Sequence, residues 1–105
     1  MKLESGLSGV IASRTLEFVS SSGVRTEYLI SIGKPVPDES GENYFCPHEI
    51  RSFGSSKVIN IYGIDAFQAL DLSLKTISPY LEYLERELGG KFYSWGELGH
   101  MFPKL

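Results

Sequence analysis

The chain has 105 residues, of which 42% are hydrophobic and 22% are charged, which is the size and composition of a single globular domain. The formal net charge is −3 and the ten lysines and arginines are scattered, so the sequence disfavours nucleic acid and anionic membranes as partners. The single cysteine, Cys46, excludes an internal disulfide and favours a reducing compartment, and no apolar run is long enough to span a bilayer. We therefore expect a cytoplasmic protein.

Two segments in which apolar and polar residues alternate predict a β-hairpin at the start of the chain. Residues 10–19 and 24–32 each alternate between apolar and polar side chains, and the Ser-Ser-Ser-Gly sequence between them has the composition of a turn. The apolar face of the first segment also carries one charged residue, Arg14, beside Leu16 and Phe18.

An acidic loop and two further strands follow. Residues 33–43 contain two prolines and three carboxylates and predict an extended, solvated loop. Residues 44–53 and 57–62 have the composition of strands. Pro47 cannot donate a ladder hydrogen bond, so its strand is expected to be an edge strand or to carry a bulge.

A long amphipathic helix is predicted over residues 65–88. Asp65, with Gln68 three residues later, forms a capping-box pattern, and Gly89 marks the end of the helix. Because the apolar pattern keeps its phase across Pro79, we expect one kinked helix rather than two. The side expected to face the core consists of Phe67, Leu70, Leu74, Ile77, Leu81, Leu84 and Leu88.

The order of these elements predicts an α+β fold in two layers. A mainly antiparallel sheet of four to five strands is covered on one face by the long, kinked C-terminal helix. The chain is expected to form one domain over residues 1–105, with strands at about 8–62, the helix at about 65–88 and an aromatic C-terminal tail at 91–105. Within the tail, Phe92 to Trp95 is expected to pack on the domain as a short strand.

One local cluster combines residue types that carry out chemistry, namely Cys46, His48 and Glu49. On a strand, Cys46 and His48 point to one side and Glu49 to the other. A thiolate–imidazole pair can act as a nucleophile or, together with His100, bind a metal. One cysteine is too few for a structural zinc site, and reactive cysteines usually lie at helix N-termini or beside a positioned base. The sequence therefore predicts no catalytic site, no metal and no cofactor, with these three residues as the alternative.

Two binding surfaces are also predicted. An outward stripe on the helix, opposite the core-facing side, suits contact with another protein or with a second copy of the chain, unless the aromatic tail covers it. The stripe consists of Leu72, Thr76, Pro79 and Tyr83. A small-ligand pocket between sheet and helix is expected to be lined by Tyr28, Tyr62 and Trp95.

Three segments resemble a small bacterial domain family whose function is not assigned. They are residues 32–41, which contain Pro-Val-Pro-Asp; residues 44–50, with the sequence Tyr-Phe-Cys-Pro-His-Glu-Ile; and residues 62–74, which begin Tyr-Gly-Ile-Asp-Ala-Phe-Gln-Ala-Leu. The resemblance implies a bacterial origin and an intracellular setting. It implies no functional residues, because the family has no assigned activity.

The small acidic domain without a catalytic constellation predicts a non-catalytic binding module that acts through protein–protein contact. An immunity or antitoxin-like protein and an adaptor are the expected classes. The expected partner is an unknown protein or a second copy of the chain, and neither nucleic acid nor a membrane. The alternatives are a small enzyme or metal site that uses Cys46 and His48, and a small-ligand binder with its pocket between sheet and helix.

Overall fold

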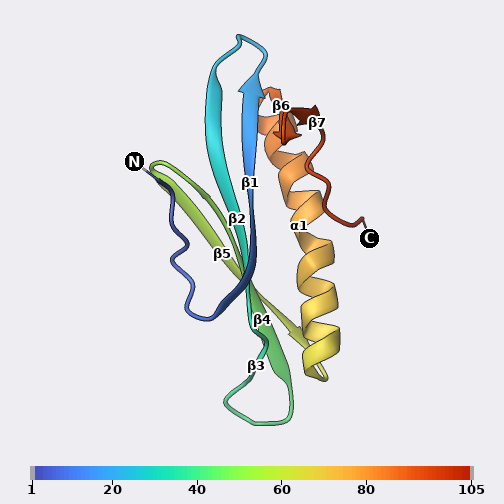
Figure 1. Cartoon of the computed structure of the whole chain (residues 1–105). Coiled ribbons are helices and arrows are strands. Elements are labelled where there is room, and N and C mark those ends of the chain that lie inside the picture. Colours follow the sequence, from blue (N-terminus) through green and yellow to red (C-terminus); the bar gives the residue numbers. More distant parts are fainter. Residues whose placement is uncertain (1, 105) are drawn as a thin grey trace.

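The computed structural model describes residues 2–104 and has the predicted α+β architecture, an antiparallel sheet packed against one long helix (Figure 1). The elements, in chain order, are β1 (Val10–Ser20), β2 (Arg25–Gly33), β3 (Val36–Pro37), β4 (Tyr44–Ser52), β5 (Ser55–Gly63), α1 (Ala66–Leu88), β6 (Gly90–Ser94) and β7 (Glu97–Leu98). The sheet has seven strands rather than four to five, because the two-residue strands β3 and β7 add to it. Across residues 2–104, no helix combines the length and the apolar character needed to cross a bilayer.

The strand order places β5 at one edge of the sheet. β1 lies between β2 and β6, and β7 extends the sheet beyond β6. β5 pairs with β4 along its whole length, from Tyr44↔Gly63 to Ser52↔Ser55. Because β5 occupies one side of β4, both β2 and β3 must pair with the other side.

The strand that contains Pro47 is an interior strand without a register shift, so the expected edge or bulge is wrong. On the side of β4 away from β5, the pairing with β2 stops at His48 and the pairing with β3 begins at Phe45. Pro47 lies in the gap between these two partners, against Gly33, where an added Cβ would come within 2.9 Å of the proline ring. The gap allows a residue without an N–H group to occupy an interior strand.

The helix has the caps that the sequence predicts. The Asp65 carboxylate accepts a hydrogen bond from the Gln68 N–H at 2.8 Å, and the Gln68 side chain accepts one from the Ile64 N–H at 2.7 Å. At the other end, Gly89 adopts the left-handed conformation with φ 69°, which favours glycine. The prediction of one helix rather than two is confirmed, since α1 continues through Pro79.

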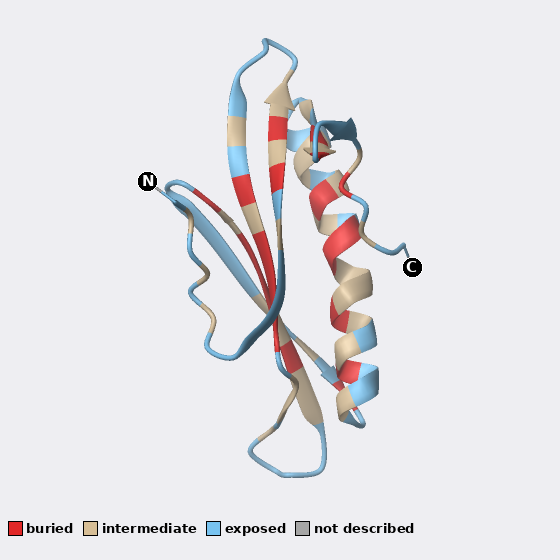
Figure 2. Cartoon of the chain, in the orientation of Figure 1, coloured by how far each residue is buried: buried red, intermediate tan, exposed pale blue. Residues whose placement is uncertain are grey.

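The buried side of α1 differs from the predicted side (Figure 2). Ile77 and Leu81 are fully buried, as predicted. Three further residues of the predicted side are half-buried, namely Leu70, Leu74 and Leu84. Phe67, however, is 84% exposed and Leu88 is 51% exposed, so their assignment to the core is wrong. The remaining buried positions of the helix carry small side chains, namely Ala69, Ser73 and Ser78.

The close approach of α1 to the sheet at the beginning of the helix explains the exposure of Phe67. A Cβ added at Gly63 would lie only 2.6 Å from the main-chain nitrogen of Ala69, so the backbones of β5 and α1 nearly touch where the helix begins. Only small side chains fit between them there, and Ala69 packs with Ile32 and Cys46. Larger side chains form a second cluster under the rest of the helix, made by Leu16, Phe18, Tyr28, Ile30, Ile50, Ile77, Leu81 and Phe92.

Candidate functional site

Cys46 and His48 lie side by side on the face of β4 that packs against α1. The Nδ1 atom of His48 is 2.9 Å from the Ser73 hydroxyl oxygen, and that hydroxyl donates to the main-chain oxygen of Cys46 at 3.1 Å. The Cys46 thiol donates to the main-chain oxygen of Gly33 at 3.2 Å. All three side chains are fully buried, so these hydrogen bonds tie α1 to β4.

The hydrogen bonds determine the tautomer of His48. Because the Ser73 hydroxyl donates to Cys46, its oxygen accepts from His48, whose hydrogen is therefore on Nδ1. The Nε2 lone pair is left buried without a hydrogen-bond partner among the described residues. Burial penalises the charged ring and lowers the pKa of His48 to about 4. His48 is therefore neutral near pH 7 and positioned as a structural link.

Cys46 is a poor nucleophile in this environment. Burial raises the pKa of its thiol above the ordinary value, so the sulfur stays protonated near neutral pH. The side chain has no exposed surface at which a substrate could meet it. A reactive cysteine needs thiolate character and access, and Cys46 lacks both.

Glu49 lies on the opposite face of β4, as strand alternation predicts, and holds the N-terminal segment against the sheet. Its buried carboxylate accepts hydrogen bonds from Ser5 at 2.9 Å, from the Gly6 N–H at 2.8 Å and from Ser56 at 2.7 Å. Arg51 forms an ion pair with it at 2.7 Å. Burial raises the pKa of Glu49, but the hydrogen bonds from Ser56, Arg51, Gly6 and Ser5 outweigh it and lower the pKa to about 2.

The structure does not assemble the three sequence candidates into one site. Cys46 and His48 face the helix, whereas Glu49 is on the other side of the sheet. His100 interacts with α1 at Ser78 and Glu82, and not with His48. Within residues 2–104, no three His, Cys, Asp or Glu side chains are grouped closely enough to hold a metal ion.

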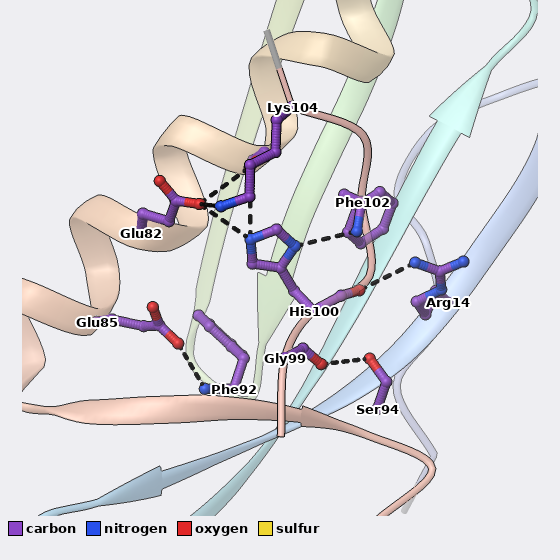
Figure 3. A network of polar contacts seen from close by, with 10 residues as sticks. Arg14, Glu82, Glu85, Phe92, Ser94, Gly99, His100, Phe102 and Lys104 are labelled. Carbon is purple, nitrogen blue, oxygen red and sulfur yellow. Dashed lines mark hydrogen bonds and ion pairs between the residues drawn. The ribbon is translucent and has the colours of Figure 1, made fainter. Parts of the chain in front are cut away.

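A polar network that sequence reasoning missed fastens the C-terminal tail to the helix and to β1 (Figure 3). The Nε2 atom of His100 is 3.4 Å from a Glu82 carboxylate oxygen, and the Lys104 ammonium donates to the same oxygen at 2.7 Å. The Arg14 guanidinium donates to the main-chain oxygen of His100 at 2.9 Å. The signal that could have found this network was Arg14 itself, a lone charge on the apolar face of a strand.

Arg14 is also enclosed by aromatic rings. Its guanidinium carbon lies 4.5 Å from the ring centre of Phe102 and 5.2 Å from that of Trp95. Both rings come from the C-terminal tail, so the tail wraps the only charged side chain on the helix-facing side of β1. Such stacking is a favourable cation–π arrangement.

The outward stripe of α1 is only partly exposed. Leu72 and Thr76 are half-buried, and the Thr76 hydroxyl donates back to main-chain oxygens of the same helix. Pro79 and Tyr83 are exposed, and the ring of Tyr83 stacks on that of Tyr80 with centroids 5.9 Å apart. Among the described residues, the hydrogen bonds from the tail to α1 go to Ser78, Glu82 and Glu85, none of which belongs to the stripe.

The three aromatic residues predicted to line one pocket lie in different places. Tyr28 is in the core, where its ring packs edge-on against Phe92. Tyr62 is 57% exposed and packs on Phe45, on the face of the sheet away from α1. Trp95 is 79% exposed and lines an open groove over β1. The pocket as predicted from these residues therefore does not form.

A different cavity does lie between the sheet and the helix. It has a volume of about 210 Å³ and lies under the C-terminal tail. Its walls include Ala12, Arg14, Ile30, Leu74, Ile77 and Phe102. Residues of both β2 and α1 line it.

Neither the curated proteins nor the solved structures contain a match to the chain. A family model described as a domain of unknown function, DUF6968, matches residues 12–103. The match extends beyond the segments that carried the resemblance and includes the N-terminal hairpin and most of the aromatic tail. It confirms the predicted membership in a family without an assigned function, and the chain belongs to the DUF6968 family.

Proposed function

We propose that the protein is a non-catalytic module that acts by binding protein, with the edge strand β5 as the contact surface. One observation carries the proposal: β5 has nine residues and pairs only with β4, so the main-chain groups along its outer side have no strand partner within residues 2–104. Such an edge is a template for an added strand.

β5 lacks most of the features that protect sheet edges. It contains no proline, its pairing has no bulge, and Lys57 is its one charged residue. Val58 and Tyr62 are 50% and 57% exposed on the face away from the helix. A long, partly apolar edge strand that remains exposed favours association with another strand.

A second copy of the chain fits this edge. An antiparallel pairing centred on Asn60 places Asn60 opposite its counterpart and Val58 opposite Tyr62 of the second copy, on both sides of the twofold axis. The same register places Lys57 opposite Gly63, so it brings no like charges together. This pairing uses residues 57–63. It therefore does not involve Ser56, the residue of β5 that bonds to Glu49 and so helps to anchor the N-terminal segment.

The geometry gives less support to the other candidate functions. An enzyme that uses Cys46 and His48 would need a thiolate and access to solvent, and burial opposes both. Pro79 and Tyr83 on α1 remain candidates for contact with a further partner, such as the target of an immunity-like protein or the client of an adaptor. Neither alternative has a feature as distinctive as the unpaired edge of β5.

Sedimentation equilibrium over micromolar to near-millimolar protein tests the proposal. We expect a concentration-dependent dimer for the native chain. Asn60→Lys places two ammonium groups opposite each other and is expected to weaken the dimer by about fivefold, which corresponds to about 1 kcal/mol. Asn60→Asp is expected to weaken it similarly, while an equimolar mixture of the two variants is expected to form a heterodimer at least as tight as the native dimer.

Asn43→Lys is the matched control, because Asn43 is an exposed residue of the acidic loop, outside β5. It adds the same charge and is expected to leave the dimer unchanged. A strictly monomeric native protein would overturn the proposed contact. So would a dimer that responds equally to substitutions at both positions, or a mixture of the Asn60 variants that fails to associate.

A further inference from the structure

The cavity under the C-terminal tail has the size and the lining of a small-ligand site. A cavity of about 150 Å³ lined by aliphatic and aromatic side chains is large enough to bind benzene. This cavity measures about 210 Å³, and Ile30, Leu74, Ile77 and Phe102 supply apolar walls from the sheet, the helix and the tail. An apolar body of about one ring therefore fits in it.

Arg14 provides a charge at the same place. It lines this cavity and also the open groove on the other side, so its guanidinium lies between the apolar interior and solvent. An arginine has five N–H donors. Among the described residues, one hydrogen bond uses them, to the main-chain oxygen of His100, and no carboxylate forms an ion pair with Arg14.

The two aromatic rings beside Arg14 hold the guanidinium in place without neutralising it. Phe102 and Trp95 contact it through their rings, which leaves its remaining N–H groups available to an anion. A planar guanidinium pairs with a carboxylate through two parallel hydrogen bonds. Because the side chain is half-buried and already oriented, such a pair needs little further ordering.

We infer that the cavity binds a small apolar carboxylate, with its single-ring or short branched body against Ile30, Leu74 and Ile77 and its carboxylate on Arg14. Residues 99–104 of the tail form the lid of this site. Phe102 covers the cavity, and the lid is fastened by the bonds from His100 and Lys104 to Glu82. No residue of β5 lines this cavity, so the test of ligand binding and the test of the proposed protein contact have independent outcomes.

Benzoate is the probe, and the single tryptophan, Trp95, is the reporter because its ring lies beside Arg14. A fluorescence titration of the native protein is expected to show saturable binding of benzoate. Two compounds serve as controls: benzyl alcohol keeps the ring and lacks the charge, and acetate keeps the charge and lacks the ring. Each is expected to bind at least about tenfold more weakly than benzoate. Isothermal titration calorimetry on the same samples gives a second readout that does not depend on Trp95.

Arg14→Gln removes the charge and is expected to weaken benzoate at least about tenfold. Arg25→Gln, at an exposed position of β2, is the matched control and is expected to bind like the native protein. Ala12→Leu adds atoms at the rim of the cavity and is expected to weaken both benzoate and benzyl alcohol. A thermal melt of each variant establishes that it is folded. If Arg14→Gln is not, Arg14→Lys replaces it, which keeps the charge but cannot form two parallel hydrogen bonds and is also expected to weaken benzoate binding.

Several outcomes would overturn the inference. One is a native protein that gives no saturable response up to the solubility limit of benzoate. Another is equal affinity for benzoate and benzyl alcohol, which would remove the role of Arg14 even without any variant. A third is benzoate binding that survives both Arg14→Gln and Ala12→Leu, which would place the ligand at an adventitious site.

Discussion

The buried imidazole of His48 predicts that the protein loses stability in mild acid. The folded protein keeps the ring neutral down to a pKa of about 4, whereas the unfolded chain takes up the proton near the ordinary value of 6.5. Between these values the unfolded state binds more protons, so the free energy of unfolding falls as the pH falls. The stability is complete above about pH 7 and declines through the window from 6.5 to 4.

The size of the effect follows from the two pKa values. His48 alone should remove about 2 kcal/mol from the free energy of unfolding at pH 5, and about 3 kcal/mol at pH 4, relative to pH 8. This is a large fraction of the roughly 5–15 kcal/mol that stabilises a typical domain. Glu49 loses its own contribution only as the pH falls from 4.5 toward 2, so it adds little above pH 5.

Urea unfolding measured at intervals from pH 8 to pH 5 tests this prediction. His48→Gln removes the ionisable ring. It is expected to reduce the loss of unfolding free energy between pH 8 and pH 5 by about 2 kcal/mol, whatever its effect on stability at pH 8. His100→Gln is the control and should leave the His48 contribution in place. If the native protein and His48→Gln lose the same free energy between pH 8 and pH 5, the reasoning from the Nδ1 tautomer and the buried Nε2 is refuted.

The remaining predictions concern the helix, the N-terminal segment and the thiol. Leu81→Ala should cost about 2–5 kcal/mol in urea unfolding, whereas Phe67→Ala should change stability by about 0.5 kcal/mol or less, and a large cost at Phe67 would contradict its exposed position. Glu49→Gln should leave Arg51 without its partner and make residues 2–8 more susceptible to limited proteolysis, and unchanged cleavage there would argue against the tether. Cys46 should react with a thiol reagent no faster than the native protein opens, so rapid modification under native conditions would refute its burial.

The parts of the fold that follow local rules were predictable from the sequence. Strand alternation gave the first hairpin, and the side-chain caps at Asp65 and Gly89 gave the limits of α1. The exposed position of Phe67 was not predictable, because a periodic pattern does not report how closely a helix approaches a sheet. That distance depends on Gly63 and Ala69, which meet only in the folded chain.

The candidate sites divide in the same way. Strand alternation correctly separates Cys46 and His48 from Glu49, since it depends on neighbours in sequence. The contacts of Ser73 with His48, and of Arg14 with Phe102, join residues far apart in the chain. The interior place of β4 was missed because the gap at Pro47 depends on where β2 ends and β3 begins.

The two core clusters differ in chemistry, and this difference gives the domain an order of disassembly. Around Ala69 the helix is held by a smaller cluster with Ile32 and Cys46 and by the His48–Ser73 hydrogen bond, whereas around Leu81 it is held by a larger cluster of aromatic and aliphatic groups. Protonation acts on the first of these and leaves the second untouched. Acid should therefore free the beginning of the helix while its later turns stay attached, and an intermediate detached at one end only would be the first species to form.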